Sequence, residues 1–177
     1  MGLERVVKME EAIAENLSAL LEKRILKIVD NYQKENEEGR KIPDILRALT
    51  NSREGSLIIG YLRSSIVSES HAFYFGFYTN ELFVEENPDY VMVKLPAFFD
   101  GIEEDIIEIE KLLEKNFIRI FTSEIEEIRR HYMVKIYERC GMLFEHVLED
   151  ESNEIKEGIK VFYGEYMGEK VTQVGIV

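Results

Sequence analysis

Hydrophobic residues near the start of the chain recur at steps of three and four positions. Between residues 13 and 32 they form a single stripe, and mostly polar and charged residues occupy the positions between them. This spacing predicts one long amphipathic helix over roughly the first thirty residues. Gly39 follows an acidic run and is the expected left-handed cap of this helix. A short second helix is predicted from Pro43, because the fixed φ of proline suits a first helical turn.

The segment 56–69, with the sequence SLIIGYLRSSIVSE, is more continuously hydrophobic. Ile59, Leu62 and Ile66 fall at helical spacing, so a buried helix is the preferred prediction. A strand is the alternative, since periodicity alone does not separate a short buried helix from a buried strand.

Residues 71–84 carry the clearest strand pattern in the chain. Phenylalanine alternates with tyrosine or glycine there: Phe73, Tyr74, Phe75, Gly76, Phe77 and Tyr78. The phenylalanines therefore share one face of the strand and the tyrosines share the other. A turn at Thr79-Asn80 and a returning strand over 82–84 would complete a hairpin, and residues 90–94 are a candidate third strand.

Two further helices are predicted from hydrophobic stripes that follow capping signals. Asp100 with Glu103, and Ser123 with Glu126, fit capping boxes. The first stripe contains Ile102, Ile106, Ile109 and Leu113, and the second contains Ile125, Ile128, Tyr132, Ile136, Cys140, Leu143 and Val147. After an acidic break at 149–153, alternation over 159–164 and a partner strand over 171–177 predict a C-terminal hairpin.

These elements predict an α+β fold. It would contain four or five helices, two of them long and amphipathic, with one or two small antiparallel hairpins or sheets. Residues 1–177 are expected to form a single α+β domain, in which residues 1–38 could be a helical appendage. The long stripes are hard to bury in a small domain, so pairing of these helices across a homodimer is a further expectation.

The charge balance narrows the classes of partner. The chain has 35 Asp and Glu residues against 22 Lys and Arg residues, which gives a formal charge of -13. Such a surface repels nucleic acid and anionic lipid, whereas a basic protein partner remains compatible with it. The simpler interpretation is that the acidity only keeps the protein soluble. A single cysteine, no apolar segment of membrane-spanning length and no signal-like N-terminus lead us to expect a cytoplasmic protein.

Motifs that would assign a metal or a cofactor are missing from the sequence. None of the three histidines has a glutamate three residues before it, and the chain has neither an HExxH motif nor a cysteine pair. Its glycines form neither a P-loop nor a dinucleotide fingerprint, and no Gly-x-Ser-x-Gly elbow occurs. We therefore expect no metal site and no cofactor.

An enzyme site assembled from scattered residues is an alternative. Glu127 and His131 lie four residues apart on a predicted helix, where the carboxylate could raise the basicity of the imidazole. His71 and Tyr74 would complete this constellation. The competing interpretation of the helical pair is an ordinary surface contact, and that of Cys140 is a small buried hydrophobic residue.

Two features favour binding rather than catalysis. Tyr74 and Tyr78 could face outward as aromatic contacts, although both faces of that strand could equally be covered. Glu103, Glu104 and Glu108 belong to an acidic run that is either a solvated helix face or a contact surface for a basic partner.

The leading hypothesis is therefore a non-catalytic binding or regulatory module that acts through protein–protein contacts. In one version of this hypothesis the module neutralises a basic partner. A small-molecule enzyme that uses the scattered His, Tyr and Glu residues is the alternative. A structural subunit of an oligomeric assembly is the second alternative.

Overall fold

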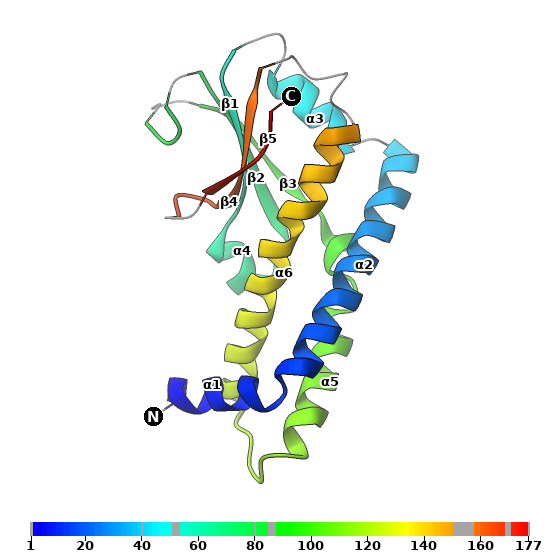
Figure 1. Ribbon diagram of the computed structural model, residues 1–177, viewed down its shortest axis with the longest axis vertical. Coiled ribbons are helices and arrows are strands. Elements are labelled where there is room, and N and C mark those ends of the chain that lie inside the picture. Colours follow the sequence, from blue (N-terminus) through cyan, green and yellow to red (C-terminus); the bar gives the residue numbers. More distant parts are fainter. Residues whose placement is uncertain are drawn as a thin grey trace.

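The computed structural model describes residues 2–39, 41–50, 54–79, 81–84, 88–150, 158–168 and 171–176. In these ranges the chain forms six α-helices, one short 3-10 helix and a five-stranded mixed sheet (Figure 1). The fold is α+β, as predicted. It contains more helices than the four or five expected, and a single sheet takes the place of separate hairpins.

The helices are α1 (Gly2–Ala12), α2 (Ala14–Gly39), α3 (Lys41–Thr50), α4 (Arg63–Val67), α5 (Ile102–Glu114) and α6 (Thr122–Asp150), and the 3-10 helix is η1 (Pro96–Phe99).

The prediction of one continuous N-terminal helix is wrong, because the helix breaks at Ile13 and α1 turns away from the axis of α2 (Figure 1). Packing decides this break: α1 buries Val6 and Met9 in the core and contacts α6. The sequence around Ile13 contains neither glycine nor proline, so it gives no sign of the break.

The strands are β1 (Ser56–Tyr61), β2 (Ala72–Tyr78), β3 (Asp89–Lys94), β4 (Lys160–Glu165) and β5 (Val171–Ile176). Their order in the sheet is β3-β2-β1-β4-β5, in which β1 and β4 run parallel and the other neighbours run antiparallel. The helix predicted over 56–69 is therefore wrong for its first half, where the strand alternative is confirmed. Because β1 is central and buried on both faces, its sequence is continuously hydrophobic and shows no alternation.

The predicted hairpin over 71–84 is confirmed only in its first strand, β2. Residues 82–84 form a turn rather than a strand, and β2 pairs instead with β3, the candidate third strand. Asn80, in the expected turn, lies outside the described residues. The C-terminal hairpin is confirmed as β4 and β5, although Val177 lies outside the described residues.

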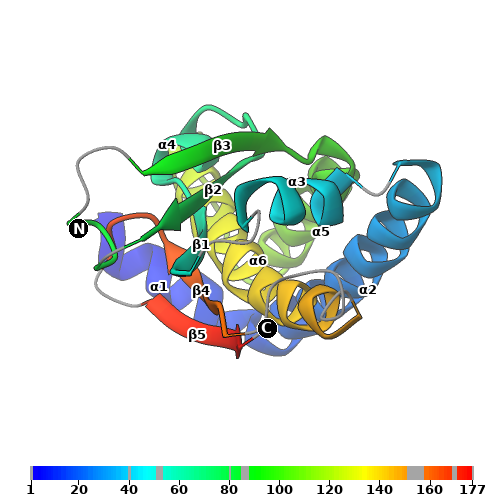
Figure 2. The same ribbon diagram turned by 90° about the horizontal axis from the view of Figure 1, so that it is seen from above.

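One face of the sheet carries the main core. Phe73, Phe75 and Phe77 belong to this core, and all six helices contribute buried side chains to the same cluster. Figure 2 shows α2, α3, α5 and α6 together on one side of the sheet. Every residue of the predicted α5 and α6 stripes is buried. The stripe of α6 is covered within the chain by α1, α2 and α5, so a homodimer is not needed to bury it.

Both predicted capping boxes differ from the observed caps. The cap of α5 is Gly101, which has a φ of 81° and makes no side-chain capping bond. At the start of α6, the Phe121 N–H donates to Glu124 Oε2 at 2.9 Å, and the Glu124 N–H donates back to the Phe121 carbonyl. The reciprocal bond expected at Ser123 therefore occurs two residues earlier in the chain.

The opposite face of the sheet is covered by a second, smaller cluster. Tyr74 and Tyr78 are 4% and 1% exposed, and their hydroxyl oxygens lie 3.1 Å apart. The cover consists of Leu82, Phe83, Phe162, Tyr166 and Val171. Gly76 allows this packing, since a Cβ there would lie 2.4 Å from the Tyr74 ring. The prediction that Tyr74 and Tyr78 face outward is therefore wrong, and the alternative, in which both faces of β2 are covered, is confirmed.

None of the helices in the described ranges is long and apolar enough to cross a membrane.

Candidate functional site

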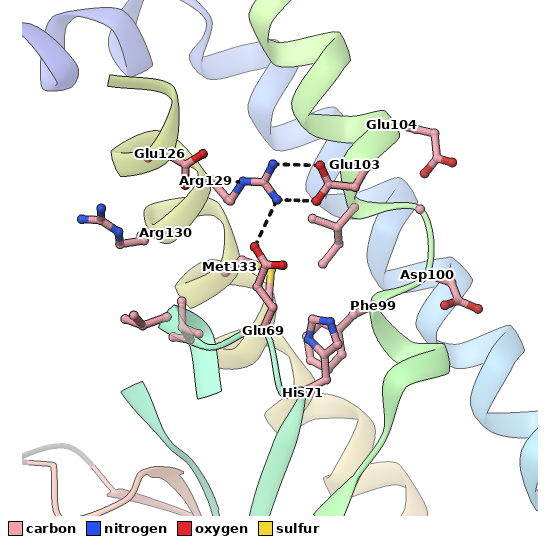
Figure 3. A pocket seen from close by; sticks show the side chains of 14 residues that line it. Glu69, His71, Phe99, Asp100, Glu103, Glu104, Glu126, Arg129, Arg130 and Met133 are labelled. Carbon is pink, nitrogen blue, oxygen red and sulfur yellow. Dashed lines mark hydrogen bonds and ion pairs between the residues drawn. The ribbon is translucent and has the colours of Figure 1, made fainter. Parts of the chain in front are cut away.

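A cleft of about 440 Å³ opens between α4, the start of α5 and the N-terminal half of α6 (Figure 3). We call it the acidic cleft, because five carboxylate side chains line it: Glu69, Asp100, Glu103, Glu104 and Glu126. Only two arginines, Arg129 and Arg130, lie among the lining residues. Five negative charges and two positive charges give the lining a formal charge of −3, when His71 is counted as neutral.

Arg129 holds the carboxylates of the cleft in place. Its guanidinium forms a bidentate pair with Glu103, in which one of the two hydrogen bonds measures 2.8 Å. The same group lies 3.5 Å from a Glu69 oxygen and 4.0 Å from a Glu126 oxygen. The hydrogen bond from Arg129 lowers the pKa of Glu103 and raises that of Arg129. Arg130 pairs outside the cleft, with Glu127. Both cations of the cleft are therefore already engaged by carboxylates.

His71 forms the floor of the cleft together with Phe99. The two rings stack with their centroids 4.5 Å apart and their planes 11° from parallel, and Figure 3 shows His71 in front of Phe99. Burial lowers the pKa of His71, and the nearby Glu69 and Asp100 carboxylates only partly oppose this shift. The imidazole is therefore neutral at pH 7. Its Nδ1 atom is buried and has no hydrogen-bond partner among the described residues.

The backbone beside His71 is strained. Glu69 and His71 have φ values of 50° and 51°, in the left-handed region that residues other than glycine rarely adopt. Such positions cluster at ligand sites, because they persist only where the surrounding structure holds them. The hydrogen bond from the Leu95 N–H to the His71 carbonyl, 3.0 Å long, is one such restraint.

The wall formed by Asp100 and Gly101 is fixed from behind by Arg24 of α2. The guanidinium of Arg24, which is 2% exposed, donates to both backbone carbonyls of this turn and to Asp105 Oδ2, at 2.7 Å in the last case. The Tyr132 hydroxyl donates to the same Asp105 oxygen at 2.8 Å. A buried ion pair therefore sets the position of the α5 N-terminus and with it one side of the cleft.

The residues of the predicted enzyme site do not meet in one place. His71 lies in the acidic cleft, whereas Tyr74 is buried in the cluster on the other face of the sheet. His131 contacts Glu127 at 3.4 Å, as expected for the helical pair, and its other ring nitrogen lies 3.2 Å from Glu10 of α1. The Glu127–His131 pair thus connects α6 to α1 and does not face His71 across a common cavity.

The residues predicted to bind a partner fall into two groups. Tyr74 and Tyr78 are buried, so they offer no contact surface. Glu103, Glu104 and Glu108 are exposed on α5, and the first two line the acidic cleft. Cys140 is buried as predicted, and burial raises its thiol pKa to about 12, which removes it as a nucleophile at neutral pH.

Sequence reasoning did not identify Glu69, Phe99 or Arg129 as parts of a site. Asp100 was predicted only as part of a capping box. The three-residue spacing of Arg129 from Glu126 on one helix is the only local pattern that indicates one of its ion pairs. The contacts of Arg129 with Glu69 and Glu103 depend on long-range packing and left no pattern in the sequence.

A second hollow, of about 610 Å³, lies where β1 and β4 end. Its Arg63 pairs with Glu165 at 2.6 Å, and burial raises the pKa of Tyr61 to about 12. In contrast to the acidic cleft, none of its lining side chains has a buried polar atom without a hydrogen-bond partner in the described part of the chain. The acidic cleft is therefore the stronger candidate site.

No three His, Cys, Asp or Glu side chains in the described ranges are grouped so that they could hold a metal ion. Comparisons of the chain with protein-family models, curated proteins and solved structures find no match.

Proposed function

We propose that the protein is a non-catalytic binding module that recognises a basic segment of a protein partner through the acidic cleft. The observation that carries the proposal is the excess of carboxylates in a cleft whose two arginines are already paired. Asp100 and Glu104 are exposed and form no ion pair with any described residue. A cation that enters the cleft would therefore meet unpaired carboxylates.

The charge of the whole chain supports the same partner class. At -13 the protein attracts basic partners over a distance, and the attraction weakens as salt is added. The enzymatic alternative has less support, since His71, Tyr74 and His131 lie in three different surroundings.

Neutralising the cleft tests the proposal. The triple variant Glu69→Gln, Asp100→Asn, Glu104→Gln removes three carboxylates without changing side-chain size. We expect it to bind a short synthetic peptide of alternating basic residues and serine about tenfold more weakly, because each rim contact contributes a fraction of a kcal/mol up to about 1 kcal/mol. Fluorescence anisotropy at low and at physiological salt measures the affinity.

A matched control separates the cleft from the general acidity of the surface. Glu108→Gln, Glu110→Gln, Glu114→Gln makes the same change in charge on exposed positions of α5 outside the cleft. The control is expected to weaken binding by less than about twofold, through long-range attraction only. Equal losses in the two variants would sink the proposal for the cleft.

A further inference from the structure

We propose that the acidic cleft takes the guanidinium group of an arginine side chain, which stacks on His71 between Glu69 and Asp100. This inference rests on the proposed function, since it names the side chain that the basic partner inserts.

The floor of the cleft offers a flat, uncharged ring. Phe99 covers one face of the His71 imidazole, and the near-parallel stack of 4.5 Å keeps the ring in a fixed orientation. A planar guanidinium stacks on an aromatic face, whereas the ammonium of lysine is a compact and strongly hydrated point charge. A neutral imidazole does not repel the incoming cation. The platform therefore favours arginine over lysine.

Carboxylates stand on both sides of this platform. In Figure 3, Glu69 lies above and to the left of the His71 ring, and Asp100 lies to its right with the carboxylate pointing away from the ring; both charges raise the pKa of His71. The Glu69 side chain is 60% exposed, and Asp100 is exposed as well. Carboxylates match the fork of N–H donors of a guanidinium, so two of them beside one platform suit arginine in particular.

The cleft offers a further acceptor, since Glu104 adds a carboxylate to its lining. Arg129 does not fill this space, because its guanidinium is engaged by Glu103, Glu69 and Glu126. Ile102 and Met133 line the cleft with apolar surface, against which the aliphatic stem of an arginine can pack.

The test compares short peptides in which serine alternates with arginine, with lysine or with the neutral analogue citrulline. By fluorescence anisotropy, the wild-type protein is expected to bind the arginine peptide about fivefold more tightly than the lysine peptide, as a stacked cation at a partly exposed site would allow. Citrulline should remove most of the binding. His71→Ala should make the arginine and lysine peptides equal without weakening the lysine peptide, and His71→Phe, which keeps a flat ring, should restore the preference.

The outcomes separate this inference from the proposed function. Equal binding of the arginine and lysine peptides by the wild-type protein, or an arginine preference that survives in His71→Ala, overturns the role of His71. The proposed function stands in that case, provided that the cleft triple variant still weakens both peptides. Failure of both peptides to bind the wild-type protein overturns the two proposals together. Circular dichroism checks that each variant is folded, and if His71→Ala does not fold, the wild-type comparison of the three peptides decides.

Discussion

Glu69 and His71 have backbone conformations that contacts with other segments of the chain must stabilise. The left-handed backbone at Glu69 and His71 costs on the order of 1 kcal/mol or more at each position. The His71–Phe99 stack and the ion pair of Glu69 with Arg129 supply contacts that hold these residues in place. Their side chains are thus held in fixed orientations, which would lower the entropy cost of binding the proposed partner.

Titration of His71 links the cleft to stability. Because burial lowers its pKa below the ordinary 6.5, the unfolded chain takes up a proton before the folded protein does as the pH falls. The contribution of neutral His71 is fully present above that value and declines below it. We predict that the free energy of unfolding of the wild type, minus that of His71→Gln, decreases from about pH 8 to about pH 5 in urea titrations.

His146 provides the control for this measurement. Its side chain is 63% exposed on α6, away from the lining of the cleft. The His146→Gln variant is measured in parallel, so that effects common to any His-to-Gln replacement can be separated from those of the cleft. A difference for His71→Gln that stays constant with pH would contradict the burial of a neutral imidazole.

At the level of elements, one buried polar cluster joins three helices. Arg24 comes from α2, Asp105 from α5 and Tyr132 from α6, and all three side chains are buried. We predict that Asp105→Asn lowers the free energy of unfolding by about 3–5 kcal/mol, because it leaves the Arg24 cation without its counter-charge. Tyr132→Phe removes only a hydrogen bond to that charged group and should cost about 1.5–3 kcal/mol. Urea unfolding measures both losses. Equal losses in the two variants would show that the ion pair adds nothing beyond the hydrogen bond.

The elements that could be predicted from the sequence are those in which hydrophobic residues recur with a helical or strand period. The stripes of α5 and α6 report which side of each helix faces the core, and the alternation in β2 and β4 marks these segments as strands. Ile13 and β1 could not be predicted in the same way. The break at Ile13 follows from packing against α6, and β1 is buried on both faces, so its hydrophobic run fits a helix equally well.

The site was less predictable than the fold. Glu103, Glu104 and His71 carry side chains whose chemistry is visible in the sequence. Their arrangement depends on Phe99 in η1, Arg129 in α6 and the turn at Gly101, which Arg24 fixes from α2. These contacts join segments far apart in the chain, and no local spacing encodes them.

On the scale of the whole molecule, the negative charge has a long-range effect on encounter and a short-range effect inside the acidic cleft. The net charge of -13 raises the rate of encounter with basic partners from any direction. Under the proposed function, the acidic cleft then selects among these encounters through its carboxylates and its fixed aromatic floor, in a volume of about 440 Å³. Affinity and arginine preference should therefore depend on the cleft, whereas the salt dependence should belong to the whole surface.

The most direct test of the account is an NMR titration of the wild-type protein with the serine–arginine peptide, followed by ¹H–¹⁵N chemical shifts. The account predicts that the largest shifts occur at residues 69–71, 99–104 and 129–133, which surround the acidic cleft. Shifts that are spread over the exposed acidic positions, with no concentration at these three segments, would contradict it.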